Sequence, residues 1–370
     1  MKVQKIITQG KTRYILLDNN YGVVDVVKRY LKFLDSTGKS PNTLKNYAFH
    51  LKTYFEYLDL AGMKYNEIGD TDKYAIVDVL SDFVGWLSNG HAFDEKISYL
   101  NPPKDKRCAK TVNIIMDVVL GFYDYLAQNK EFEWLDVYKT QRSNSLFKGF
   151  LYEMSSKNRM VRKNIFHKRE TNKRLEYITR AEYKKMLECC RLQRDKLLLA
   201  LMFEGGLRIG EALGLYIMDI DVWENKINIV PRDMLENGVR VKNEAAGSLY
   251  LPTYVMKLMT AYLLDEADGN NTDYIFLNLF GRNSGAAMRP ITVNKLFERL
   301  SRNIGRKITP HMCRHGHATE LHEAGWDLID IKDCLRHRQI QTTIGYTHTS
   351  DEYKRQQLKD FYEKRGLNFE

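Results

Sequence analysis

The sequence predicts a mainly α-helical protein with a small antiparallel β-sheet, divided into two domains. A chain of 370 residues is longer than a single hydrophobic core usually organises. Apolar residues recur at helical spacing over most of the chain, whereas strand-like runs are confined to its start and to residues 226–251. A strongly basic stretch, residues 155–176, separates two such regions and is typical of an interdomain linker.

Composition indicates a soluble protein with a polyanionic partner. Hydrophobic residues make up 44% of the chain and charged residues 28%, and no apolar run approaches the roughly 18 residues that span a bilayer. The start of the chain lacks a secretion signal, so a cytoplasmic location is expected and no membrane partner. The five cysteines include no CxxC pair, which argues against a disulfide framework and a zinc ribbon. The net charge of +10 favours binding to phosphates.

The amino-terminal region is expected to hold a hairpin followed by helices. Residues 3–8 and 12–17 are short apolar-rich runs around a glycine, which suits a β-hairpin. Apolar residues at helical spacing then continue to Gly38, where a helix is expected to end. Ser40 suits the N-cap of the next helix and Pro41 its first position. Two further helices are expected over residues 73–89 and 108–128.

The second domain is expected to begin at Thr179, which with Glu182 forms a capping-box pattern. Turn signals at Asn237-Gly238 and Ala246-Gly247 punctuate three short β-like runs, which predict a small antiparallel sheet. The expected strands are 226–230, 239–242 and 248–251. The expected helices are 180–192, 194–204, 210–215, 253–267, 291–304, 310–325, 328–336 and 351–364.

A set of polar residues makes phosphodiester chemistry without a metal plausible. The set consists of Arg208, Lys242, His311, Arg314 and His337, followed by Tyr346. The transition state of attack on a phosphodiester concentrates negative charge on the non-bridging oxygens, so an enzyme without a metal needs fixed cations there. Arginine forks bind phosphate oxygens bidentately and stay charged. Arg208 also lies at a predicted helix start, where the backbone favours an anion, although each arginine alone would be an ordinary surface residue.

The strings around these residues carry a resemblance to a known family. They are Gly206-Leu207-Arg208-Ile209-Gly210-Glu211, His311-Met312-Cys313-Arg314-His315, Leu335-Arg336-His337 and Gly345-Tyr346-Thr347-His348. In this order and spacing, residues 22–350 resemble the tyrosine recombinase (phage integrase) family. The usual third string is Leu-Gly-His, so Arg336 is a departure.

The resemblance implies a role for each residue. Arg208 and Arg314 would hold the scissile phosphate while Tyr346 attacks it, leaving a 3′-phosphotyrosyl bond and a free 5′-hydroxyl. Lys242, on a β-hairpin, would protonate the leaving oxygen, with Arg240 as the rival. His311 would bind the phosphate or assist proton removal from Tyr346, whose ordinary pKa is about 10. His337 would donate a hydrogen bond to the phosphate. Glu211 would orient the catalytic groups, and His315 would support them.

The same resemblance implies a two-domain, C-shaped clamp around duplex DNA, with an α+β catalytic domain. Its parts would be an N-terminal extension at 1–21, a helical core-site-binding domain at 22–154, the basic linker at 155–176, the catalytic domain at 177–349, and a C-terminal helix or tail at 350–370. That tail either returns to its own domain or, as the resemblance favours, is exchanged between protomers.

Candidate DNA-contacting residues lie in the first domain and the linker. Ser40, Thr43 and Tyr47 match a string of the family's core-binding domain. Other basic residues could follow the phosphate backbone, although a charged helix face or linker is often only solvated. These residues are Lys45, Lys110, Arg162, Lys163, Lys168 and Arg169.

The expected function is site-specific recombination by an integrase or transposase of a mobile element, through a phosphotyrosyl intermediate and a Holliday junction. The partners expected are double-stranded DNA with inverted-repeat core sites and a homo-tetramer on paired sites, while an accessory directionality or DNA-bending factor is left open. No cofactor, metal or ATP is implied, because the phosphotyrosyl bond conserves the energy of the broken one. The alternatives are a Xer-type dimer resolvase, a type IB topoisomerase, and a non-catalytic DNA-binding regulator.

Two rival interpretations concern individual residues. His311, Cys313, His315 and His317 are dense enough to suggest zinc, but the glutamate of a His-Glu-x-x-His site is missing and Arg314 would place a cation beside the metal. Among the 23 tyrosines, Tyr353 and Tyr362 lie close enough downstream to replace Tyr346 as nucleophile.

Overall fold

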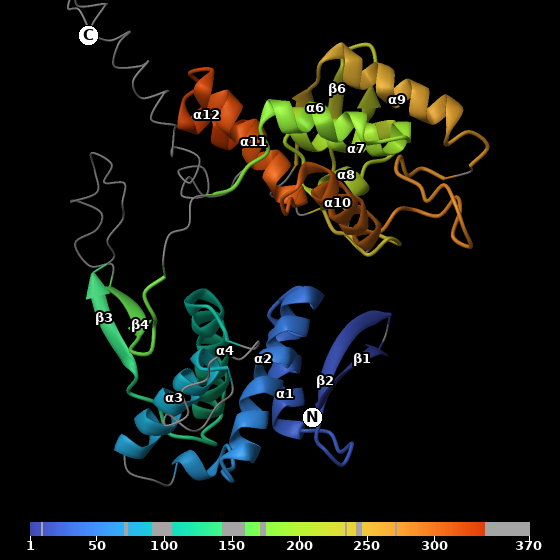
Figure 1. Cartoon of the computed structure of the whole chain (residues 1–370). Helices are drawn as coiled ribbons and strands as arrows, with labels where there is room; N and C mark the ends of the chain where they lie inside the picture. The colour runs from blue at the N-terminus through green and yellow to red at the C-terminus, as the bar shows by residue number, and fades with distance from the viewer. Residues whose placement is uncertain are drawn as a thin grey trace, which may run out of the picture. The chain divides into compact units, whose positions relative to one another are not determined.

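The computed structural model describes residues 1–8, 10–69, 73–90, 106–142, 160–170, 175–233, 235–241, 246–270 and 272–336. The chain divides into two compact units, Met1–Asn172 and Lys173–Glu370 (Figure 1). Each unit has its own hydrophobic core and is described by itself. The fold is mainly helical with small antiparallel sheets, as the sequence predicts.

The first unit combines a helical core with two β-hairpins. Strand β1 pairs with β2 and strand β3 with β4, both antiparallel. The amino-terminal hairpin belongs to the core of this unit, because Leu16 is fully buried among residues of the helices. The elements are β1 Lys2–Thr8, β2 Lys11–Leu17, α1 Asp25–Ser36, α2 Pro41–Leu60, a 3-10 turn Glu67–Gly69, α3 Lys73–Ser88, α4 Ala109–Gln128, β3 Tyr138–Arg142 and β4 Met160–Asn164.

Local sequence explains where the second helix begins and how it packs. The Ser40 hydroxyl accepts a hydrogen bond from the Thr43 amide (3.3 Å), and Pro41 occupies the first turn of α2. The core that α2 shares with α4 is rich in aromatic rings. The buried hydroxyls of Tyr54 and Tyr123 lie 2.7 Å apart.

One part of the expected linker is a strand. Met160–Asn164, inside the basic stretch 155–176, forms β4 and pairs with β3 in the first unit. Both strands are rich in polar and charged residues, so they lack the apolar alternation by which strands are recognised. The following segment is tied to α4, because the buried Asn113 side chain accepts from the Lys168 amide (2.8 Å) and donates to Glu170 Oε1 (2.9 Å).

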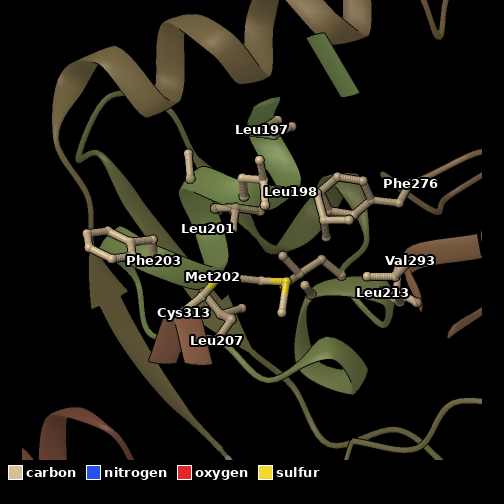
Figure 2. Packing of buried hydrophobic residues seen from close by; sticks show 14 of the residues in the cluster. Leu197, Leu198, Leu201, Met202, Phe203, Leu207, Leu213, Phe276, Val293 and Cys313 are labelled. Carbon is tan, nitrogen blue, oxygen red and sulfur yellow. The ribbon is translucent and has the colours of Figure 1, made fainter. Parts of the chain in front are cut away.

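The second unit packs helices around α7, whose residues Leu197 to Phe203 are all buried. Figure 2 shows Leu201, Met202 and Phe203 of this helix among side chains from several other segments, including Cys313. The helices are α6 Arg180–Glu188, α7 Gln193–Glu204, α8 Ile209–Leu213, a 3-10 turn Ile217–Asp219, α9 Thr253–Asp265, α10 Pro290–Ile304, α11 Pro310–Glu323 and α12 Leu328–Cys334.

The sheet of the second unit has the strand order β5-β6-β7 and differs from the expected one. Its strands are β5 Ile220–Asp221, β6 Lys226–Ile229 and β7 Gly247–Tyr250. The expected strand at 239–242 was wrong for the residues described there: Val239 and Val241 are buried in the core, and Val241 forms only an isolated bridge with Arg232. The apolar alternation in this segment reflects burial in an irregular connection rather than sheet pairing.

The capping box expected at the start of the second unit is present. The Thr179 hydroxyl accepts from the Glu182 amide, and the Glu182 carboxylate accepts from the Thr179 amide (3.0 Å). Arg306 also binds Glu182 (2.7 Å). None of the helices in the described part of the chain is both long and apolar enough to cross a membrane.

Candidate active site

A tight glycine turn brings Arg208 to the start of α8. Gly206 has a φ of +57°, and a β-carbon at this position would lie 2.8 Å from both the His317 ring and the Leu335 side chain. Only glycine accommodates this backbone without strain. Arg208 is therefore the N-cap of α8, and its side chain remains 34% exposed.

Glu211 lies three residues after Arg208, in the first turn of α8, and its side chain is almost completely buried, with 4% exposed. Its carboxylate accepts from the Arg208 backbone amide (3.0 Å) and from Arg208 Nη1 (2.5 Å). The same glutamate thus caps the helix and fixes the guanidinium. A buried carboxylate is stabilised only when it is paired in this way.

Helix α11 brings the second arginine to the same carboxylate. Gly316 lets α11 approach closely, since a β-carbon there would collide with the Ile178 carbonyl oxygen and lie 2.8 Å from Phe203. Arg314, two residues earlier in the same helix, has a side chain that is 3% exposed. It donates to the carbonyl oxygens of Gly206 (2.5 Å) and Leu335, and its Nη1 lies 3.6 Å from Glu211 Oε2.

A third arginine, Arg336, reaches Glu211 from the end of α12. Its Nη2 donates to Glu211 Oε2 (3.1 Å), and its Nη1 donates to the Cys334 carbonyl (2.9 Å). The backbone of Arg336 has a φ of +54°, in the region that favours glycine. In the sequence, Arg336 is visible only as a departure from a glycine-containing string, and no pattern assigns it to the site.

The charges around Glu211 determine its ionisation. Burial by itself would raise the pKa of Glu211, but Arg336, then Arg314 and Arg208, outweigh burial and lower that pKa. The carboxylate is therefore charged at neutral pH. Three guanidinium groups against one carboxylate leave an excess of two positive charges among the residues that the structure describes here.

The pKa values of three histidines of α11, His311, His315 and His317, are lowered. Burial, followed by the charges of Arg314 and Arg208, lowers the pKa of His311, although Glu211 acts in the opposite direction. Burial, with His311 and Arg314, lowers the pKa of His315 to about 4. Burial also lowers the pKa of His317, beside Gly206, to about 4. A neutral His311 next to two arginines can accept a proton or a hydrogen bond.

The rival zinc set is not assembled in the described part of the chain. Cys313 is fully buried in the hydrophobic core (Figure 2), and burial raises the pKa of its thiol. A thiol must lose its proton to bind zinc. No group of three or more potential ligands occurs among the residues described in the structure.

Three predicted catalytic residues, Lys242, His337 and Tyr346, lie outside the described residues. His337 directly follows Arg336, a described residue that binds Glu211. Arg240, the rival of Lys242, is exposed and forms an ion pair with Asp233.

The predicted DNA-contacting residues of α2 are placed on or near its surface. Ser40 and Thr43 are half-buried, and their hydroxyls lie 2.9 Å apart in the helix cap. Tyr47 is partly buried against the core, while Lys45 is exposed. The cap alone explains Ser40, so these positions leave the prediction of DNA contact open.

The remaining candidates lie on α4, in β4 and in the segment that follows β4. Lys110 and Arg169 are exposed, and Lys168 Nζ donates to Ser88 Oγ (2.5 Å). Arg162 and Lys163 are residues of β4, and their side chains lie outside the described part. All of these belong to the first unit, together with α2.

Comparison with known proteins places this arrangement in context. Residues 176–353 match the model of the phage integrase family. Transposase A from transposon Tn554 of Staphylococcus aureus is 37% identical over 369 residues, which is 99% of both chains. Tyrosine recombinase XerA of Thermococcus onnurineus is 24% identical over 333 residues, or 90% of this chain and 93% of the relative. The structure of the Tn1549 transposon integrase in complex with a circular intermediate DNA shares the fold, with a TM-score of 0.60 at 16% identity, covering 91% of this chain and 99% of that one.

Proposed function

The chain belongs to the phage integrase family, the tyrosine recombinases, and we propose that the cluster around Glu211 is its strand-cleavage site. The protein is a site-specific recombinase of the mobile-element type. The observation that supports the site most strongly is the single buried carboxylate of Glu211, which holds Arg208 by backbone and side chain and pairs with Arg314 from a distant helix.

In the proposed reaction, Arg208 and Arg314 bind the non-bridging oxygens of the scissile phosphate. The Tyr346 phenol attacks phosphorus, and neutral His311 accepts its proton or hydrogen-bonds the phosphate. The bond from phosphorus to the 5′-oxygen breaks, and Lys242 supplies the proton that this oxygen takes up. His337 donates to the phosphate, and His315 supports α11 next to His311.

The cleaved strand is then held as a 3′-phosphotyrosyl ester, and a 5′-hydroxyl from another strand reverses the reaction. Because the ester conserves the energy of the broken bond, the chemistry needs no ATP. We further propose that exchange proceeds through a Holliday junction in a homo-tetramer on two inverted-repeat core sites. An accessory directionality or DNA-bending factor is a further partner to test, and DNA in the cytoplasm is the expected substrate.

The two units have separate proposed tasks. The second unit would hold the catalytic domain, 177–349, with the C-terminal segment 350–370 exchanged between protomers. The first unit would hold the core-site-binding domain, 22–154. Lys110, Lys168 and Arg169 would contact phosphates, together with the α2 residues Ser40, Thr43, Lys45 and Tyr47 and the β4 residues Arg162 and Lys163. The net charge of +10 of the whole chain supports DNA binding in general.

A suicide substrate tests the proposed chemistry. A duplex core site, verified by gel shift, carries a nick beside the scissile phosphate so that the short 5′-hydroxyl fragment diffuses away after cleavage. Wild-type protein should give an SDS-stable protein-DNA adduct. Tyr346→Phe should abolish it, and Tyr353→Phe, a matched change close by, should not.

Other outcomes identify the rival functions. Absence of an adduct on the verified site would favour a non-catalytic regulator. An adduct together with relaxation of plasmids that lack paired sites would favour a topoisomerase. An adduct that survives Tyr346→Phe but not Tyr353→Phe would move the nucleophile to Tyr353.

A further inference from the structure

Arg336 is the one described arginine of the site that sequence patterns did not assign. Its side chain is only 6% exposed, and its Nη2 hydrogen-bonds Glu211 Oε2 at 3.1 Å, closer than the 3.6 Å between that oxygen and Arg314 Nη1. Arg336 therefore binds the glutamate more directly than Arg314 does. Arg314 instead directs hydrogen bonds to the carbonyls of Gly206 and Leu335.

The backbone of Arg336 is unusual for the residue that it carries. A φ of +54° is strained for a side chain with a β-carbon, and such strain persists only where the surroundings fix it. Here the fixed contacts are the hydrogen bonds to Glu211 and to the Cys334 carbonyl. The aliphatic part of the side chain also passes close to Gly247, where a β-carbon would lie 3.4 Å from Arg336 Cδ.

These contacts place Arg336 between three segments that carry proposed catalytic residues. Glu211 belongs to α8 and holds Arg208. Gly247 begins β7, a few residues after Lys242. His337 follows Arg336 directly in the chain. A substitution of Arg336 would therefore act most directly on the Glu211 carboxylate, because Glu211 is the only charged partner described for the Arg336 guanidinium.

We propose that Arg336 is a positioning residue for strand cleavage: it binds the Glu211 carboxylate that fixes Arg208, and it adds a third positive charge beside Arg314. The inference rests on the proposed function of the site. A phosphodiester carries one negative charge and its transition state about two, so the excess of two positive charges among the described groups, to which Lys242 would add, stabilises the transition state more than the ground state. Without Arg336 the excess falls to one.

Within the described residues, charged and titratable groups from three elements face Glu211. They are Arg208 at the start of α8, His311 and Arg314 on α11, and Arg336 after α12. Of the arginine charges, that of Arg336 lowers the pKa of Glu211 most. Loss of Arg336 should therefore raise the pKa of Glu211, and Glu211 would be protonated, releasing Arg208, at a higher pH than in the wild type.

Three variants separate positioning from a merely structural role. Arg336→Gly introduces the residue that best suits a positive φ. Arg336→Met keeps an unbranched side chain without charge, and Arg336→Lys keeps the positive charge without the planar guanidinium group. Single-turnover cleavage of the suicide substrate by the Gly and Met variants should fall on the order of 10- to 100-fold near neutral pH, as for other residues that orient catalytic groups. The acid limb of their pH-rate profiles should move to higher pH, and the Lys variant should recover part of both effects.

Acid unfolding of the same variants, followed by circular dichroism, gives a readout that does not depend on catalysis. The midpoint should move to higher pH in the Gly and Met variants. An unchanged midpoint, unchanged cleavage, or a fall in rate that is equal at every pH would overturn the inference. A wild type that forms no adduct contradicts the proposed function instead, and the acid midpoint still decides whether Arg336 supports Glu211.

Discussion

At the scale of single residues, Glu211 is the group on which the site depends. It is buried, it caps α8 through the Arg208 amide, and it binds guanidinium groups of Arg208 and Arg336. A carboxylate in this position is costly to bury and is retained because its partners are cations that would otherwise repel one another. Its role is therefore structural and electrostatic at once.

Replacing Glu211 by glutamine should weaken the second unit. The amide has nearly the same shape but leaves buried arginines without a countercharge, so Glu211→Gln should lower the free energy of unfolding by about 3 kcal/mol at neutral pH. Urea unfolding measures this, with the exposed Glu188→Gln as the control. A change no larger than that of the control would contradict the proposed importance of Glu211.

The pH dependence of this loss follows from the lowered pKa of Glu211. A lowered pKa means that the carboxylate stabilises the fold above its ordinary value of 4.5 and that this stabilisation is lost as the pH falls through the folded value. The difference between wild type and Glu211→Gln should therefore be full at neutral pH and should shrink in acid, below pH 4.5.

The sequence could identify the site residues that lie in short motifs, but not the one whose role depends on a tertiary contact. Arg208, His311 and Arg314 lie in short strings with a fixed spacing, and the structure brings all three to Glu211. Arg336 was missed because a charged residue at a glycine position looks like a local disturbance. Its contact with Glu211 depends on tertiary structure that no local pattern encodes.

At the scale of helices and strands, helix-capping residues predicted the structure better than the alternation of apolar and polar residues did. Ser40 and Thr179 cap helices as their sequence context predicts. The hairpin of β3 and β4 was not predicted because its strands carry few apolar residues, and the run around Val241 was apolar without being a strand. A helix cap is formed by residues that are neighbours in the sequence. A strand pairs with another segment of the chain, and the pattern of apolar residues does not show which segment that is.

The packing of α11 can be tested at one glycine. Gly316→Ala places a methyl group against the Ile178 carbonyl and Phe203, so α11 must shift, and the second unit should lose about 3 kcal/mol of stability. Because Arg314 moves with the helix, cleavage should fall as well. Thermal unfolding and the adduct assay measure the two effects.

The matched control is Gly85→Ala in α3, where a β-carbon meets nothing within 4 Å. This change should leave cleavage unaltered and stabilise the first unit by up to about 1 kcal/mol, because alanine favours the helix. Equal effects of the two substitutions would refute the close approach of α11 to Ile178.

At the scale of the whole molecule, the described residues form two separate cores, to which we assign DNA binding and strand cleavage as proposed tasks. The first unit has its own aromatic-rich core, and the second carries the Glu211 cluster. Composition could predict two units and a polyanionic partner. The two units divide between Asn172 and Lys173, inside the basic stretch 155–176. Charge alone did not reveal that part of this stretch is the strand β4.

The proposed phosphate contacts of the first unit predict a salt effect. Each of Lys110→Gln and Arg169→Gln should reduce the slope of log binding constant against log salt concentration by about one. Fluorescence anisotropy on a core-site duplex measures the slope. Lys28→Gln, an exposed position on α1 that is paired with Asp25, should leave the slope unchanged. Equal slopes for all variants would remove Lys110 and Arg169 from the interface.

The central claim is that a phenol is linked to DNA at a phosphate held by the Glu211 cluster. Mass spectrometry of the protease- and nuclease-digested adduct tests it most directly, by identifying the residue that carries the nucleotide and the chemistry of the DNA end. The prediction is a nucleotide joined through its 3′-phosphate to the peptide that contains Tyr346, with a 5′-hydroxyl on the released strand. A 5′-phosphate link, or attachment to any other residue, would contradict it.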